Sequence, residues 1–218
     1  MFFPYKDDNP RILVPVVTYG IIAANVLIFL YQFTLAMSGP ESEARFIYMF
    51  GLIPAQFHII NLFTSMFLHG GIAHILGNMW FLWIFGDNIE DSMGHLRFLA
   101  FFILTGLIAV GAHVFLSPDS SIPMVGASGA ISGIMGAYFI QYPKARIKTL
   151  VVFGWFHVWR IPAWIFLGIW TGMQFLGLGA AATGDGGGIA YAAHLGGLFA
   201  GLGLVFLFRK TKPANAWI

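Results

Sequence analysis

Six apolar runs of membrane-spanning length divide this chain and restrict it to a helical membrane fold. The runs cover approximately residues 14–37, 72–90, 96–116, 127–142, 162–178 and 189–208. About 20 residues of helix cross a hydrocarbon layer of ~30 Å, and a helix satisfies its own backbone hydrogen bonds there. Only 9% of the residues are charged, whereas a soluble domain carries roughly 25%. We therefore predict an all-α membrane protein with six transmembrane helices.

The polar segments at the two ends enclose a single membrane domain. Residues 1–13 form a short N-terminal segment, 14–208 the membrane domain and 209–218 a basic tail. Ten of the eleven Lys and Arg residues lie on the side of both termini, and Arg45 lies on the other. Because Lys and Arg accumulate on the cytoplasmic side of a membrane, we predict that both termini are cytoplasmic. The net charge of +2 gives no reason to expect nucleic acid as a partner.

Three connecting segments have patterns of their own. The long first loop, 38–70, contains an amphipathic stretch that we expect to lie as a short helix at the interface. Residues 86–94 are read as a tight turn. Residues 144–161 alternate basic and apolar side chains, which is typical of an interfacial loop or of a strand-like hairpin.

A serine stands among small residues at the start of the fourth run, in Gly126-Ala127-Ser128-Gly129. This run is short: about 16 residues at ~1.5 Å each give ~24 Å, so one of its ends lies below the membrane surface. Gly129 and Gly133 are four residues apart, the spacing by which membrane helices pack closely. Helix packing and a reactive hydroxyl are therefore both predicted here. Ser132, one turn beyond Ser128, is expected to bond back to a backbone carbonyl.

Three further polar side chains belong to the outer parts of other runs. His74 and Asn78 are one turn apart in the second run, and His194 is near the start of the sixth. Polar groups inside a membrane are costly and indicate function. Histidine can take the proton of a serine hydroxyl, while His74, Asn78 and the backbone N–H groups that begin the fourth run can donate to an oxyanion. No acidic residue lies within a run near His194, so the pattern predicts a Ser-His dyad rather than a triad.

Other hydrolytic chemistries do not fit the sequence. The G-x-S-x-G motif fails because residue 130 is alanine, and there is no H-E-x-x-H motif for a zinc protease. A pair of intramembrane aspartates is lacking, since Asp119 and Asp185 both fall in loops. The chain has no cysteine, which excludes disulfides and thiolate metal sites.

Three motifs resemble the signatures of the rhomboid intramembrane serine proteases. They are Gly126-Ala127-Ser128-Gly129, His74-Ile75-Leu76-Gly77-Asn78, and Ala193-His194-Leu195-Gly196-Gly197 with Gly201. The resemblance covers nearly the whole chain. It implies the six-helix rhomboid-like bundle of bacterial members, with a long, partly helical first external loop, in a bacterial inner membrane.

The resemblance also implies roles for individual residues. Ser128 would be the nucleophile, His194 the general base, and His74, Asn78 and the Ser128 backbone N–H the oxyanion hole. The family cleaves single-span membrane proteins near the outer bilayer face without a cofactor or metal, so such proteins and membrane lipids are the partners implied. His69 resembles a family position of less definite role, and Glu90 and Gly94 resemble structural positions. Where some members have an aromatic ring stacked on the catalytic histidine, this chain has Ser132, so His194 must be positioned by other contacts.

Two alternatives remain open. One is an inactive member of the same fold that binds and escorts membrane proteins, although such members usually lack the nucleophile or the base. The other is a transporter or metal-handling channel that uses four histidines, His69, His74, His113 and His194. For a protease, we predict that the fifth run, 162–178, is the gate for substrate, because a glycine-rich turn at 184–188 joins it to the sixth run.

Overall fold

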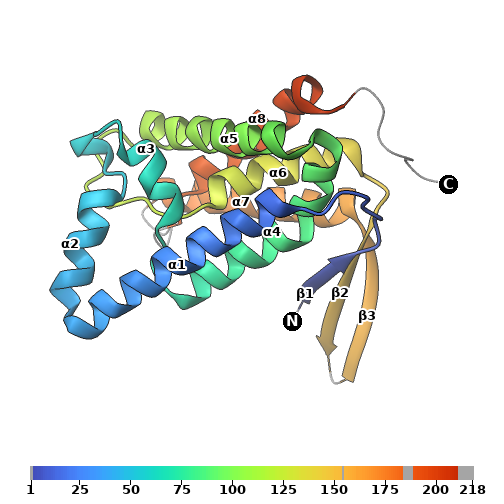
Figure 1. Cartoon of the computed structure of the whole chain (residues 1–218), viewed down its shortest axis with the longest axis horizontal. Helices are drawn as coiled ribbons and strands as arrows, with labels where there is room; N and C mark the ends of the chain where they lie inside the picture. Colours follow the sequence, from blue (N-terminus) through green and yellow to red (C-terminus); the bar gives the residue numbers. More distant parts are fainter. Residues whose placement is uncertain (1, 154, 184–188, 211–218) are drawn as a thin grey trace.

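Apolar helices account for most of the fold, and they surround one short central helix (Figure 1). The computed structural model describes residues 2–153, 155–183 and 189–210. The principal helices are α1 (Val16–Ser38), α2 (Pro40–Phe50), α4 (Ile72–Met93), α5 (His95–Leu116), α6 (Ser128–Gln141), α7 (Ala163–Ala182) and α8 (Tyr191–Phe208). Shorter turns of helix lie in the first loop: η1 (Pro54–Gln56), α3 (Asn61–Thr64) and η2 (Ser65–Phe67).

Within the described residues, four helices are long and apolar enough to cross a membrane: α1, α5, α7 and α8. The chain is thus a multi-pass membrane protein. The second and fourth predicted runs form α4 and α6, which fall outside this set. Helix α6 has only 14 residues, and α4 carries Asp87, Glu90 and Asp91 at its C-terminal end.

The prediction of an all-α fold is wrong in one part of the chain. Strands β1 (Phe2–Asp7), β2 (Arg146–Phe153) and β3 (Trp155–Pro162) form an antiparallel sheet in the order β1-β2-β3. The alternating segment 144–161 therefore adopts the hairpin that was one of the two readings of its pattern. The N-terminal segment, expected to be only a polar extension, supplies the third strand, because β2 offers it a free edge.

The prediction of a turn at residues 86–94 is also wrong over most of that range. Helix α4 continues to Met93, and the chain turns at Gly94, which has a φ of 81°. The carboxylate of Glu90 explains why a charged residue remains helical and buried here. It accepts hydrogen bonds from the backbone N–H groups of Val17 (2.9 Å) and Thr18 (2.7 Å) at the start of α1. Those N–H groups have no partner inside their own helix, so Glu90 has the structural role expected of it.

Helix α6 lies at the centre of the bundle, and every residue from Gly129 to Tyr138 is buried. Its closest neighbour is α8, because glycines bring the two backbones into direct contact. A Cβ atom added at Gly197 or Gly201 would collide with the carbonyl oxygen of Gly129 or Gly133. The small-residue spacing in both runs therefore has the packing role that was predicted for it.

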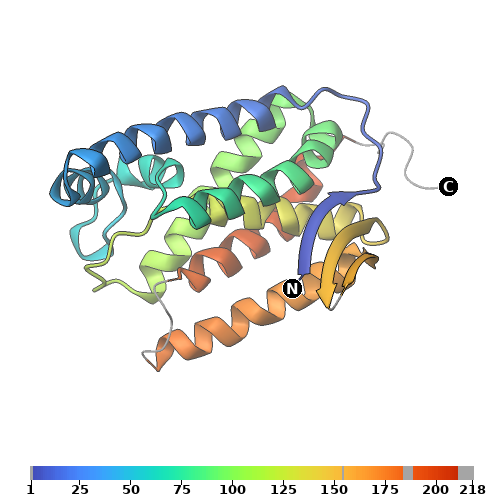
Figure 2. The same ribbon diagram turned by 90° about the horizontal axis from the view of Figure 1, so that it is seen from below.

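Helix α7 packs less closely than the other long helices. Figure 2 shows it at the edge of the bundle beside α8. Of its described residues only Ala163, Leu167 and Gln174 are buried. Its aromatic side chains Trp164 and Phe175 are about half exposed (53% and 51%).

The sheet is fastened to the base of α6 by a buried carboxyl group. Asp7, in β1, is 5% exposed, and it accepts a hydrogen bond of 2.5 Å from the hydroxyl of Tyr138. Burial raises the pKa of the Asp7 carboxyl from 3.8 to about 7, and the nearby acids Asp87 and Asp8 add to this effect. The Tyr138 hydrogen bond acts in the opposite direction, since it favours the carboxylate.

Candidate active site

Helix α6 begins at Ser128, and the turn before it brings the serine against α4. Gly126 has a φ of 121°, a conformation that favours glycine. A Cβ atom at this position would lie 2.7 Å from Nε2 of His74, so the turn requires glycine for its space as well as its backbone. The N–H of Gly126 donates to the carbonyl of Ser65 at 2.9 Å. Ser128 thus directly follows a turn that is held by this backbone geometry and hydrogen bond.

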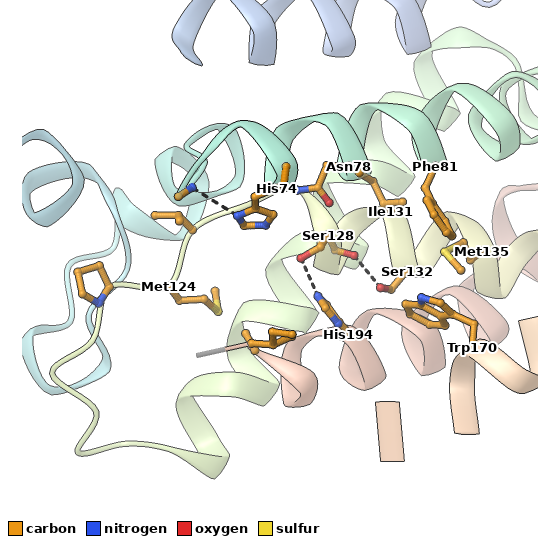
Figure 3. Close-up of a pocket in the computed structure, with 17 residues that line it drawn as sticks. His74, Asn78, Phe81, Met124, Ser128, Ile131, Ser132, Met135, Trp170 and His194 are labelled. Atoms are coloured by element: carbon orange, nitrogen blue, oxygen red, sulfur yellow. Dashed lines mark hydrogen bonds between the residues drawn. The ribbon is translucent and has the colours of Figure 1, made fainter. Parts of the chain in front are cut away.

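Ser128 and His194 are in direct contact. The Nε2 atom of His194 lies 2.8 Å from Oγ of Ser128, and Figure 3 shows the two side chains facing each other from α6 and α8. This approach depends on the glycine contacts between the two helices, because His194 lies just one turn before Gly197. The structure therefore brings together the pair that the sequence indicated.

A third residue, Gln174, completes the hydrogen bonding of the imidazole and was missed in the sequence. Its Oε1 lies 2.7 Å from Nδ1 of His194, while its own Nε2 donates to the carbonyl of Trp170 at 3.3 Å. A carbonyl oxygen can only accept, so the imidazole carries a proton on Nδ1. The lone pair of Nε2 is then available to the Ser128 hydroxyl. An amide side chain in a largely apolar run was the available signal.

His74 and Asn78 lie on α4 across the pocket from His194 and face Ser128 (Figure 3). The backbone N–H of Gly70 donates to Nδ1 of His74 at 3.4 Å, a long hydrogen bond. In the neutral ring this leaves the proton on Nε2, the atom that lies near Gly126. The Nδ2 amide of Asn78 is buried and has no hydrogen-bond partner among the described residues. Both side-chain donors lie beside Gly126, two residues before Ser128, because a Cβ atom there would be 2.7 Å from Nε2 of His74 and 3.4 Å from Nδ2 of Asn78.

These groups line a cavity with a volume of about 620 Å³. Its wall is otherwise mostly apolar and includes Phe81, Met124, Ile131, Met135 and Trp170. Ser132 also lies on the wall, and its hydroxyl donates to the Ser128 carbonyl at 2.6 Å. The prediction of a backward hydrogen bond from Ser132 is confirmed.

The remaining histidines of interest do not join a cluster with these groups. His69 is fully buried behind His74, and the two rings meet edge to face at 5.1 Å. Burial lowers the pKa of the His69 imidazole to about 4, so this ring is neutral at pH 7. His113 is absent from the cavity wall. Among the residues that the structure describes, no three His, Cys, Asp or Glu side chains are grouped to hold a metal ion.

A larger groove of about 1300 Å³ opens beside the first cavity, between α4 and α7. Apolar side chains line both of its sides, among them Leu76 and Trp80 from α4 and Ile169 and Met173 from α7. Phe81 and Trp170 line both hollows. The cavity that holds Ser128 therefore adjoins an apolar surface groove.

The fold and the site define the chain as a helical, multi-pass membrane protein with a serine–histidine pair in an internal pocket. The family described as "Rhomboid domain" matches residues 56–211, well over half of the chain. This chain belongs to the rhomboid family.

Individual relatives show how far the similarity extends. Rhomboid protease GluP of Bacillus subtilis (strain 168) is 35% identical over 127 residues, which are 56% of this chain and 24% of that protein. The human mitochondrial presenilin-associated rhomboid-like protein is 29% identical over 209 residues, which are 89% of this chain and 50% of that protein. The chloroplastic rhomboid-like protein 11 of Arabidopsis thaliana is 27% identical over 207 residues, 90% of this chain and 67% of that protein. The chain thus spans about half or less of the length of the first two.

Proposed function

We propose that this protein is an intramembrane serine endopeptidase that cleaves the transmembrane segments of single-span membrane proteins. Ser128 is the nucleophile and His194 the general base. The observation that carries the proposal is the 2.8 Å contact between Oγ of Ser128 and Nε2 of His194, in a pocket bordered by transmembrane helices. The names of the relatives support it, because the Bacillus relative is called a rhomboid protease.

The first chemical step is the attack of Ser128 on a peptide carbonyl. The hydroxyl gives its proton to Nε2 of His194 while Oγ bonds to the carbonyl carbon. The C–N bond then breaks, and the imidazolium returns the proton to the leaving amine. Water repeats the sequence on the acyl-enzyme, which releases the carboxylic acid and restores Ser128. No further base is needed, because His194 serves in both halves of the cycle.

The negative charge on the carbonyl oxygen develops on the side of α4. The Nε2–H of His74 and the unpaired Nδ2 of Asn78 are aimed at this region. The N–H of Ser128 is also available, since the first N–H groups of a helix have no intrahelical partner. One such donor in an oxyanion hole contributes about 10²–10³ to kcat.

The membrane topology follows from six crossings, with α4 and α6 added to the four long apolar helices. Both termini are then cytoplasmic, and Ser128 lies toward the outer bilayer face. This arrangement is supported by the distribution of Lys and Arg along the sequence. The short α6, about 21 Å long at ~1.5 Å per residue, places the serine below the outer surface.

Substrate reaches the pocket from the lipid phase through the groove between α4 and α7. Support comes from the apolar lining of the groove and from the three residues that it shares with the pocket, Gly77, Phe81 and Trp170. Helix α7 is the element that moves, since little of it is buried. The glycine-rich segment 184–188, predicted from the sequence to be the turn that joins the fifth run to the sixth, lies outside the described residues.

The test is covalent labelling with a fluorophosphonate probe in detergent, followed by cleavage of a reconstituted single-span substrate. Wild type should label and cleave, and Ser128→Ala and His194→Ala should do neither. Ser132→Ala is the matched control, because it removes a hydroxyl one turn away on the same helix, and it should still label. A folded wild type that does not label would favour the binding-only alternative. Labelling that persists in Ser128→Ala would refute the assignment of the nucleophile.

A further inference from the structure

Gln174 is the polar member of the three buried residues of α7, and its side chain is fully engaged. Its Oε1 accepts from Nδ1 of His194 at 2.7 Å. Its Nε2 donates to the carbonyl of Trp170, four residues earlier in the same helix. This second bond fixes which end of the amide faces the imidazole. The uncharged Oε1 of Gln174 therefore accepts from the imidazole at the position where a catalytic triad has a carboxylate.

The contact determines which nitrogen of His194 can act as a base. With the proton held on Nδ1, the lone pair of Nε2 points at the Ser128 hydroxyl. The other tautomer would place a proton between the two groups and prevent the transfer. A buried carboxylate would stabilise the imidazolium more strongly, but an uncompensated charge is costly within a membrane.

The aromatic rings near the imidazole of His194 restrict its rotation less than the hydrogen bond to Gln174 does. The ring of Trp170 lies 6.0 Å from that of His194, tilted by 35°, and the ring of Tyr191 lies 6.4 Å away, edge to face. Ser132 donates its hydroxyl to the backbone and offers no ring to stack. Apart from the contact with Ser128 itself, the hydrogen bond from Nδ1 is thus the directional contact among the described residues that sets the plane of the ring.

We propose that Gln174 is a positioning residue for His194 and that helix α7 thereby carries part of the catalytic alignment. This inference rests on the proposed function. When α7 moves outward to admit a substrate, Gln174 leaves Nδ1 and the base loses its fixed tautomer. Proton transfer resumes only when α7 returns to its place. Substrate entry and catalysis therefore alternate, and Ser128 does not attack while α7 is displaced.

Two substitutions at Gln174 separate positioning from packing. Gln174→Met keeps the length of the side chain and removes the acceptor. It should slow fluorophosphonate labelling and lower kcat by about 10- to 100-fold, while KM changes little. Gln174→Glu restores an acceptor, so it should recover labelling. It should also move the acid limb of the pH–rate profile to higher pH, because a carboxylate favours the imidazolium. Leu176→Met, a change at an exposed position of α7 outside the lining of the groove, is the control and should match wild type.

The outcomes distinguish the two proposals. If wild type and Gln174→Met are labelled at the same rate, the positioning role is overturned and the protease assignment stays intact. Equal impairment of the Met and Glu variants also overturns it, since packing alone would give that result. Wild type that does not label removes both proposals.

A second readout needs no activity. Nitrogen NMR of histidine-labelled wild type, with His194 assigned by comparison with His194→Ala, should show the proton on Nδ1. A proton on Nε2 would overturn the inference.

Discussion

Replacement of Asp7 by asparagine should remove a pH dependence from the stability of this protein. Burial raises the pKa of the carboxyl from 3.8 to about 7 in the folded state. Between these values the folded chain holds a proton that the unfolded chain has released. Stability must therefore fall as the pH rises from about 4 to about 7, and it is constant above that window.

The size of the effect follows from the displacement of the pKa. A difference of about 3 pH units, at 1.36 kcal/mol per unit, corresponds to about 4 kcal/mol. Asparagine keeps an oxygen that can accept from Tyr138 and carries no charge at any pH. The stability of the Asp7→Asn variant should therefore not fall as the pH rises, and the variant should be more stable than wild type at pH 8.

The assay is thermal unfolding in detergent across this pH range. One kcal/mol moves Tm by ~2–4 °C in a chain of this size, so the Tm difference between the two proteins should change by roughly 8–16 °C between pH 4 and pH 8. Asp119→Asn is the control, because it removes an exposed carboxyl that does not act on Asp7, and it should follow the wild-type curve. Parallel curves for wild type and Asp7→Asn would refute the reasoning.

Three other substitutions test the packing, the capping and the gate. Gly201→Ala should lower Tm, because its Cβ would collide with the α6 backbone, whereas Gly203→Ala, with open space around it, should not. Glu90→Gln should cost about 1.5–3 kcal/mol for each charge-assisted hydrogen bond to the start of α1 that it weakens, measured as a drop in Tm. Cross-linking Phe81→Cys in α4 to Phe166→Cys in α7 with a reducible bis-thiol reagent, at positions whose rings are 6.3 Å apart, should block cleavage until the linker is reduced. Undiminished cleavage by the cross-linked protein would contradict the gating role of α7.

Much of the helical fold could be predicted from the sequence, because a membrane imposes helices on apolar runs. The hydrophobic runs located α1 and α4 to α8 to within a few residues, and small residues indicated the contact between α6 and α8. The end of α4 could not be read in this way. Gly86, Glu90 and Asp91 look like a turn by composition. They are helical because Gly86 lies against Thr18 and the two acids accept hydrogen bonds from the segment leading into α1.

The sheet and one part of the site depend on contacts between distant residues. Alternation in 144–161 allowed a hairpin, but its pairing with residues 2–7 is set by an edge that exists only after folding. The proximity of Ser128 and His194 could be inferred because small residues mark the helix faces that carry them. Gln174 could not, since its partner lies on another helix and nothing in a run of apolar residues shows which face is turned inward.

The hydrogen bond between Asp7 in β1 and Tyr138 in α6 has a consequence for the biogenesis of the protein. Asp7 and Tyr138 are separated by 131 positions along the chain, and β2 follows both in the order of synthesis. Strand β1 must therefore stay unpaired while the residues of α1, α4, α5 and α6 are synthesised. The strand can close only when the hairpin has emerged on the same side of the membrane. Placement of the helices between β1 and β2 is thus a precondition for the pairing of the two strands, and a chain in which they lie on opposite sides of the membrane cannot complete its sheet.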